Sequence, residues 1–237
     1  MKRHILTILA VIVGFNVIHA QEPVTDQTEI SPFTWGVRAG FAATGTYLTK
    51  AIIDERKIID YTQDTQVGNF AALLVRFNSK SFLLQTGLGL GFNKSSFTLD
   101  RNSWNPESNT KSNVSCSYSM VSVMLPLQVG YHIVNQDPYC MSVFTGPRLR
   151  YIPDKYYSSD FSGFEPYQIT ESPNPFAIGW TAGLSVQIGR TFLDFEYEAT
   201  IGRLTKGMKD TSGADPAPSY TLDRRVGIIS FSYGIMF

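Results

Sequence analysis

The stretch VGIISFSYGIMF, residues 226–237, alternates between two sets of side chains up to the last residue. One set is Ile229, Phe231, Tyr233, Ile235 and Phe237, and the other is Ser230, Ser232, Gly234 and Met236. A period of two is typical of a β-strand whose two faces meet different surroundings. Terminal residues that bury little apolar surface gain too little to offset the entropy of ordering them. The aromatic end therefore indicates that this last strand is held within a larger sheet.

The same alternation occurs in eight segments along the chain. We expect strands at about residues 33–48, 67–77, 81–93, 117–134, 139–152, 176–188, 191–201 and 224–237. Short and long connections between these segments alternate strictly. The short ones are 78–80, 135–138 and 189–190, and the long ones are 49–66, 94–116, 153–175 and 202–223. In an even-stranded antiparallel barrel this order places all short turns at one rim and all long loops at the other, as in outer-membrane barrels with periplasmic turns and external loops.

The first 20 residues have the features of a secretory signal peptide. Lys2 and Arg3 precede an apolar stretch that is too short for a spanning helix, which needs roughly 20 residues. We therefore expect a signal peptide at residues 1–20, a short periplasmic segment at 21–32 and a barrel at 33–237.

The composition argues against some classes of partner and surface. Removal of residues 1–20 leaves 18 basic and 20 acidic side chains, a net charge of −2, so nucleic acid is not expected as a partner. Charged residues make up 17% of the chain, against roughly 25% in ordinary soluble domains. Part of the surface is therefore expected to face lipid rather than water.

Side-chain size predicts which face of each strand points outward. In segment 176–188 the large set is Phe176, Ile178, Trp180, Leu184, Val186 and Ile188, and the intervening set is Ala177, Gly179, Thr181, Gly183, Ser185 and Gln187. The interior of an eight-stranded barrel is only wide enough for side chains to fill, so the small residues belong inside. We expect a closed eight-stranded antiparallel up-and-down transmembrane β-barrel, all-β in class. A soluble lipocalin-like barrel with an apolar interior remains the alternative.

Charged side chains fall on the small-residue face. They are Arg38, Arg76, Arg148, Arg150, Asp194, Glu196 and Glu198. Buried charges need opposite charges and hydrogen bonds close by. We interpret them as a polar network in the lumen; the alternative is a set of solvent-facing charges on a soluble sheet.

Two resemblances extend this interpretation. The alternation that ends at Phe231, Tyr233 and Phe237 resembles the C-terminal signal that barrel-assembly machinery recognises in outer-membrane proteins. The segments WGVRAGF (35–41), LLQTGLGLGF (83–92) and VSVMLPLQVGYHI (121–133) are similar to the PorT-like outer-membrane beta-barrel family of Bacteroidota. That resemblance implies eight strands and an outer-membrane location, and PorT itself is tied to protein secretion and gliding.

The sequence offers little support for catalysis. His132 is the one histidine left after signal removal, and its parity places it inside the barrel near the short-turn rim, where a structural role is expected. HExxH, GxSxG, CxxC and phosphate-loop motifs are absent from the sequence. We therefore predict a non-enzymatic protein without catalytic residues, cofactor or metal.

The third long connection is rich in aromatic residues. Tyr156, Tyr157, Phe161, Phe164 and Tyr167 are candidate contacts for a protein or glycan partner, and they are equally compatible with a cover over the barrel mouth or with an aromatic girdle.

Cys116 and Cys140 are the only cysteines. A turn centred between Gln136 and Asp137 would place Cys140 opposite Ile133 and Cys116 near the other rim, roughly 56 Å away at about 3.3 Å per residue. A disulfide needs Cα atoms within about 7 Å, so two free thiols are predicted.

The predicted function is that of a small outer-membrane barrel with a plugged polar lumen, embedded in outer-membrane lipid and acting as a structural or interaction protein through its external loops. The alternatives are a PorT-like accessory of secretion or assembly, a lipid-modifying enzyme, and a soluble lipocalin-like carrier.

Overall fold

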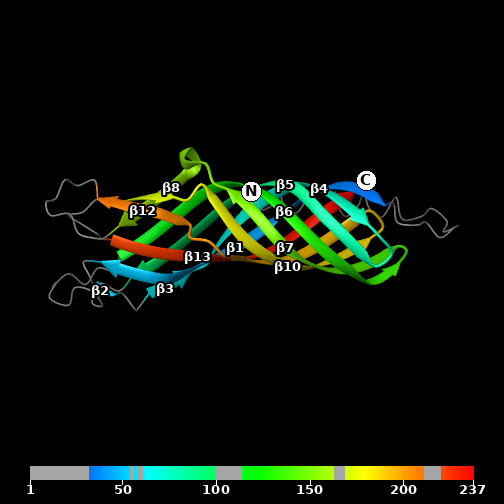
Figure 1. Ribbon diagram of the computed structural model, residues 1–237, viewed down its shortest axis with the longest axis horizontal. Coiled ribbons are helices and arrows are strands. Elements are labelled where there is room, and N and C mark those ends of the chain that lie inside the picture. Colours follow the sequence, from blue (N-terminus) through cyan, green and yellow to red (C-terminus); the bar gives the residue numbers. More distant parts are fainter. Residues whose placement is uncertain (1–31, 54–55, 58–60, 100–113, 163–168, 211–219) are drawn as a thin grey trace, which may run out of the picture.

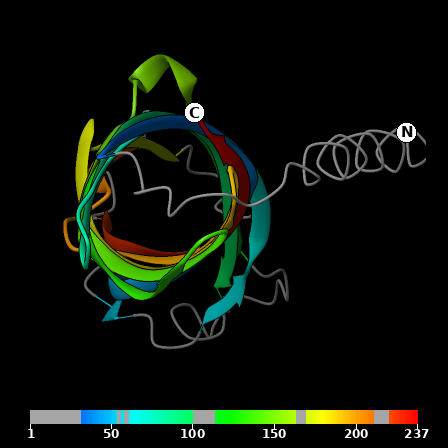
Figure 2. The ribbon, with the colours of Figure 1, turned by 90° about the vertical axis from the view of Figure 1, so that its right-hand side faces the viewer.

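A closed barrel of eight long antiparallel strands makes up most of the computed structural model (Figures 1 and 2). The structure describes residues 32–53, 56–57, 61–99, 114–162, 169–210 and 220–237. The barrel strands are β1 (Phe33–Ile53), β4 (Gln66–Asn78), β5 (Phe82–Leu99), β6 (Val114–Gln136), β7 (Tyr139–Tyr151), β10 (Phe176–Ile188), β11 (Thr191–Thr200) and β13 (Tyr220–Met236). The predicted eight-stranded fold is confirmed. The predicted signal peptide, and the segment that follows it up to residue 31, lie outside the described residues.

The barrel closes between its first and last strands. β13 pairs with β1 from Gly36 opposite Met236 to Ile53 opposite Tyr220, and its other edge pairs with β11. The Phe237 amide donates a hydrogen bond of 2.7 Å to the Trp35 carbonyl, and the two rings stack at 4.7 Å. The last strand is thus paired on both sides, which removes an open edge that lipid could not hydrogen-bond.

One predicted register is wrong. Cys140 pairs with Asn135 rather than with Ile133, because the turn of the β6–β7 hairpin is centred between Asp137 and Pro138. Proline has no amide hydrogen to donate to a ladder, so Pro138 takes a turn position and the partner of Cys140 moves by two residues.

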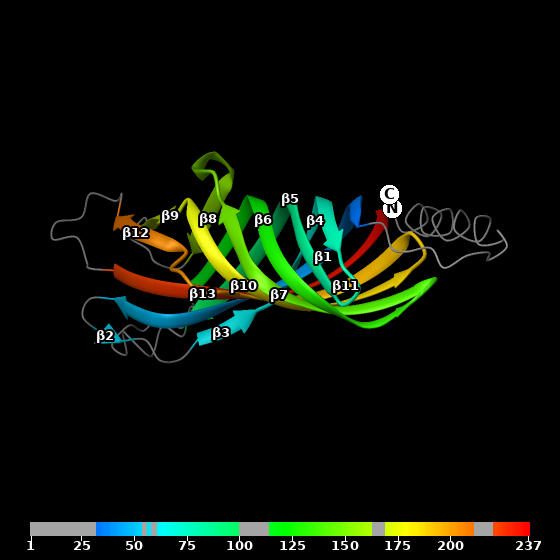
Figure 3. The same ribbon diagram turned by 45° about the vertical axis from the view of Figure 1, so that its right-hand side comes forward.

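The strands continue well past the predicted boundaries at the end opposite the C-terminus (Figure 3). Shorter elements extend the wall there: β2 (Arg56–Lys57), β3 (Tyr61–Asp64), β8 (Tyr157–Ser162), β9 (Ile169–Pro173) and β12 (Thr205–Asp210), with the 3-10 helix η2 (Asp154–Tyr156) between β7 and β8. These stretches were expected to be loops. Their outward side chains are polar, as at Lys94, Ser158 and Thr170, so the hydropathy alternation weakens although the backbone hydrogen bonds between strands continue.

The outer wall is apolar along the rest of its height. The large set of β10 points outward, with exposed fractions from 38% to 58%. Aromatic pairs mark both edges of this band: Phe33 with Phe77 and Phe82 with Tyr131 near the short turns, and Tyr151 with Phe176 toward the long connections. This arrangement matches the lipid-facing band and aromatic girdles of outer-membrane barrels.

Among the described residues, no helix has the length and apolar character needed to cross a bilayer.

Two apolar layers fill the interior above and below a polar middle. One layer, near the short turns, is Leu74, Phe192 and Met236. The other, toward the mouth, is Ala42, Met120, Ile152, Ala177, Leu204, Val226 and Ile228. Glycine makes room for the rings inside: a Cβ on Gly234 would lie 2.2 Å from Phe192 Cζ, and one on Gly183 would lie 2.5 Å from Phe144 Cζ.

Candidate functional site: a filled polar lumen

Six charged side chains in the middle of the lumen form a charge ladder: Arg38, Arg148, Arg150, Asp194, Glu196 and Glu198. The three carboxylates occupy alternate positions of β11, so the pleat points all of them inward. The arginines come from β1 and β7, each of which is one strand removed from β11. Small residues on the strands between, such as Gly179 of β10 and Ser232 of β13, leave space for the long side chains to cross.

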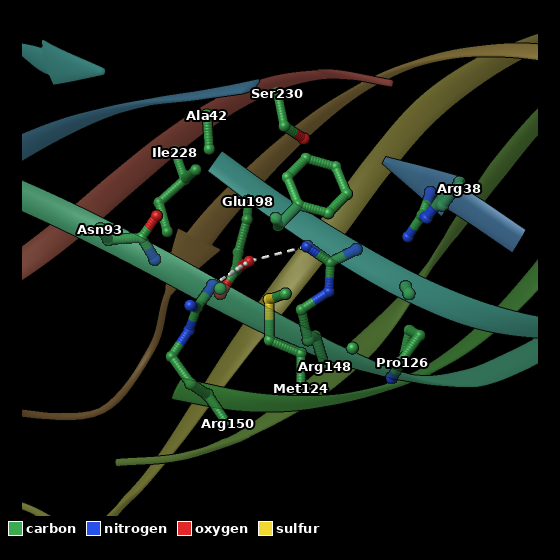
Figure 4. A pocket seen from close by; sticks show the side chains of 14 residues that line it. Arg38, Ala42, Asn93, Met124, Pro126, Arg148, Arg150, Glu198, Ile228 and Ser230 are labelled. Atoms are coloured by element: carbon green, nitrogen blue, oxygen red, sulfur yellow. Dashed lines mark hydrogen bonds and ion pairs between the residues drawn. The ribbon is translucent and has the colours of Figure 1, made fainter. Parts of the chain in front are cut away.

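The ladder is continuous. Arg38 Nη1 lies 3.0 Å from Asp194 Oδ2 and also pairs with Glu196. Arg148 joins Glu196 to Glu198, and its Nη1 lies 2.9 Å from Glu198 Oε2. Arg150 Nη2 ends the series at 2.8 Å from the same oxygen. Glu198 lies between the guanidinium groups of Arg148 and Arg150 in Figure 4.

The electrostatics of the ladder are balanced. Three positive charges face three negative ones, and every ladder side chain is at most 6% exposed. Desolvation of such charges is costly and is offset only by close pairing and hydrogen bonds. The arrangement therefore ties three strands together, β1, β7 and β11.

Arg76, the seventh residue of the predicted network, belongs to a different group, the amide row of Arg76, Gln85, Gln128 and Thr181. Arg76 Nε donates to Gln85 Oε1 at 2.9 Å, Gln85 to Gln128 at 3.0 Å and Gln128 to Thr181 at 2.8 Å. The two glutamines were not predicted to be part of the network. The signal in the sequence was their position on the inward face, where the neighbouring residues on the same strand include glycines.

Little free space remains between the ladder and the upper apolar layer. A cavity of about 20 Å³ is lined there by ladder residues together with Phe70, Met124 and Asn93. Figure 4 labels Met124 and Asn93 beside Arg148, Arg150 and Glu198. That volume holds about one water molecule. The middle of the lumen is therefore filled by side chains.

A second polar group, the mouth cluster, lies above the lipid-facing band and consists of Tyr118, Tyr157, Glu171, Thr205 and Arg224. Arg224 Nη2 lies 2.9 Å from Glu171 Oε1, and its guanidinium carbon lies 3.6 Å from the centre of the Tyr118 ring. The Tyr157 hydroxyl donates to Glu171 Oε2 at 2.8 Å. Burial, with the Glu171 carboxylate nearby, raises the pKa of Tyr157 and keeps it a donor.

The sequence analysis missed the mouth cluster because its members lie in short strands that were expected to be loops or on strand ends with weak alternation. The signal in the sequence was the position of Arg224, an even number of residues from the inward Ser230 and Ser232. The structure buries Arg224, at 2% exposed, and points its neighbour Arg225 outward.

The family model for the outer membrane protein beta-barrel domain matches residues 19–205. The chain belongs to this family of outer-membrane β-barrel proteins. The outer membrane is therefore its location, and the soluble lipocalin-like alternative is excluded.

Solved outer-membrane barrels are similar to this family member at low identity. OprG from Pseudomonas aeruginosa is 11% identical, with 90% of this chain and 99% of that chain covered at a TM-score of 0.49. Ail, the attachment invasion locus protein of Yersinia pestis, is 12% identical, with 86% and 98% covered at 0.40. The protease OmpT from Escherichia coli is 9% identical, with 90% and 100% covered at 0.45. A search of curated protein sequences found no match.

The predicted loop contacts of this outer-membrane barrel divide into two groups. Tyr156 is 56% exposed. Tyr157 points inward into the mouth cluster, and the Phe161 ring meets Tyr118 edge-on at 5.9 Å. Alternate residues of β8 face the interior, so these two rings lie as expected for a cover over the barrel mouth. Phe164 and Tyr167 lie outside the described residues.

The residues of the proposed assembly signal lie on the outer wall of the barrel. Phe231 and Phe237 are 51% and 53% exposed, and Tyr233 is partly exposed.

At the short-turn rim, His132 Nδ1 lies 2.8 Å from Ser142 Oγ. Both cysteines are free, as predicted, with Cys116 buried and Cys140 partly exposed. Among the described residues, no group of three or more His, Cys, Asp or Glu side chains is placed to hold a metal ion.

Proposed function

We propose that this barrel conducts no solute and acts as a structural or interaction protein through its external mouth and loops. The observation that supports this most directly is the filled lumen, in which the ladder and the upper apolar layer border a cavity of only about 20 Å³. A barrel that offers no passage can act only at its rims or on its outer wall.

The mouth is built as a rigid platform. The ion pair between Arg224 and Glu171 connects β13 to β9, and Tyr157 adds β8 to the same group. Rigid scaffolds commonly present binding groups on the connections they carry. The four long connections all leave from this platform, so a protein or glycan partner would meet them first.

We propose a non-enzymatic role. Glu196 and Glu198 each accept from two arginines, so neither is available as a general acid or base. The carboxylate of Glu171 is likewise engaged by Arg224, Thr205 and Tyr157.

The PorT-like resemblance suggests a more specific version of this role, as an accessory of secretion or assembly. In that version the partner at the mouth is a component of the secretion or assembly machinery.

A photo-crosslinking pair tests the proposal. A photoreactive amino acid replaces Tyr156 at the mouth or Tyr139 at the opposite rim; the two tyrosines are 56% and 58% exposed. In living cells we expect a discrete adduct from position 156 that is absent from position 139. Discrete adducts from position 139 alone would contradict a partner at the external mouth.

A further inference from the structure

Three polar side chains form a rim cluster at the short-turn end of the lumen: His132 of β6, with Cys140 and Ser142 of β7. Cys140 Sγ lies 3.3 Å from His132 Nδ1 and 3.5 Å from Ser142 Oγ. His132 pairs with Ser142 across the hairpin, and Cys140 lies on the same face as Ser142 because the two are two residues apart on β7. A thiol and an imidazole thus lie within hydrogen-bonding distance.

The imidazole is oriented to act as a base for this thiol. Its Nδ1 lies 2.8 Å from Ser142 Oγ and 3.3 Å from Cys140 Sγ, while its Nε2 is buried without a hydrogen-bond partner among the described residues. Proton transfer from Sγ to Nδ1 would create a thiolate beside an imidazolium, which is how Cys–His pairs activate a nucleophile.

A buried cation lies on the same side of the lumen. Arg76 is 2% exposed and donates to Gln187 at 3.2 Å, and Gln187 is the direct strand partner of Cys140. No ion pair joins Arg76 to a carboxylate within the part of the chain that the structure describes; Asp194, the ladder acid on this side, pairs with Arg38. Arg76 is thus joined to the rim cluster through Gln187.

Cys140 has no disulfide partner in its own chain. Cys116 is 1% exposed, lies beyond the lipid-facing band toward the mouth, and has a pKa that burial raises above its ordinary value. Cys140 is partly exposed at the rim of short turns, which in outer-membrane barrels faces the periplasm. That compartment is oxidising, so a thiol without an internal partner meets disulfides from other molecules.

We propose that Cys140 is a thiol–disulfide exchange site with His132 as its base, and that it takes a disulfide substrate from the periplasm. His132 Nδ1 accepts the proton of the Cys140 thiol, and the thiolate sulfur attacks one sulfur of the substrate disulfide. A new sulfur–sulfur bond forms as the substrate's own bond breaks. The departing thiolate leaves with the electron pair and receives the proton from His132. The total number of disulfide bonds is unchanged, and a second thiol reverses the step.

The rate of mixed-disulfide formation tests this chemistry. The full mature barrel carrying Cys116→Ser is folded in detergent, treated with oxidised glutathione at neutral pH, and followed by intact mass. An unassisted thiol is only a few per cent thiolate at pH 7, so we expect His132→Gln to slow the adduct about tenfold or more. Tyr131→Phe, which changes the exposed outward neighbour of His132 and leaves the rim cluster intact, should react at the rate of its parent.

Two comparisons keep the result interpretable if a variant assembles poorly. In denaturant the thiol loses the imidazole, so the folded Cys116→Ser barrel should react faster than the same protein unfolded. In a Cys140→Ser barrel the buried Cys116 should form no adduct. Equal rates for folded Cys116→Ser and its His132→Gln derivative would overturn the proposal, as would a folded thiol slower than the unfolded one.

Acid-quenched cells identify the source of the disulfide. After alkylation, a non-reducing gel and mass spectrometry separate a small-molecule adduct on Cys140 from a crosslinked protein. Either adduct supports the proposal and names its substrate class, and a Cys140 that is wholly unmodified in such samples overturns it.

Discussion

At the scale of single residues, the lumen shows why charges can lie inside a membrane barrel. Every ladder carboxylate meets at least one arginine, and Glu196 and Glu198 each meet two. Outward positions of the same strands hold Leu193, Phe195 and Tyr197, because charges there would face lipid. The strand pleat points adjacent side chains to opposite faces, so charged residues enter the polar lumen and their apolar neighbours face lipid.

Removal of one ladder arginine should destabilise the barrel strongly. Arg148→Ala leaves Glu196 and Glu198 each with one partner lost, and breaking a buried pair costs about 3 to 5 kcal/mol. The exposed Lys155→Ala serves as the control and should change stability by less than about 0.5 kcal/mol. Unfolding followed by heat-dependent gel migration measures both. Equal melting temperatures would mean that the ladder contributes nothing.

At the scale of elements, the seam between β13 and β1 has a different role from the extended wall at the mouth. The seam is an antiparallel strand pair that runs to the stacked rings of Trp35 and Phe237. The extended wall stands above the lipid band, where its outward side chains are polar and its interior is fixed by the mouth cluster. The seam therefore closes the barrel, and the extended wall forms the surface of the mouth.

Deletion of Phe237 should reduce the amount of assembled barrel. The deletion removes two hydrogen bonds with Trp35, the stacked ring and the terminal aromatic of the proposed assembly signal. Phe82→Ala, which removes another outward aromatic from the same rim, is the control and should assemble near the normal level. The heat-modifiable fraction in isolated membranes is the measurement. A normal fraction after deletion would exclude a sorting role for this residue.

Two adjacent arginines give a sharp test of the mouth. Arg224→Gln leaves the Glu171 carboxylate buried without its ion-pair partner, whereas Arg225 points outward and is exposed. External protease should therefore cut the Arg224→Gln mouth several-fold faster than the parent, and Arg225→Gln should behave like the parent. Identical cleavage of the two variants would show that the mouth cluster does not hold the wall together.

At the scale of the whole molecule, closure and filling act together. Every barrel strand has two neighbours, so its backbone groups are satisfied without water. The interior is divided into apolar, polar and apolar layers, and side chains occupy the lumen at each of these levels. The barrel therefore has a lumen filled by side chains and two different ends, the short-turn rim and the mouth.

Reconstituted protein should show conductance at the baseline of a protein-free bilayer. Side chains fill the lumen of an eight-stranded barrel, and here the cavity between the ladder and the upper apolar layer holds about one water. Single-channel recording in planar bilayers checks this, with heat-dependent migration of the same sample as proof of folding. Steady large channels would contradict a filled lumen.

The amino-acid sequence by itself determined the number of strands, their order, and the direction of each side chain in the lipid-facing band. These features depend on parity and on solvent contrast, which are local: Phe195 and Glu196 differ in face because they are adjacent. The inward position of all seven predicted lumen charges follows from the same rule.

Only the tertiary structure decided which side chains meet. Arg38 reaches Asp194 across β13, and Arg224 reaches Glu171 from a strand end to a short strand, because barrel closure and strand tilt bring distant positions to one height. The Pro138 turn and the irregularity beside His132 determine that Cys140 lies against an imidazole. Such contacts depend on the register between strands. A shift of two residues keeps every side chain on its own face, so the alternation within one strand does not specify which residues pair.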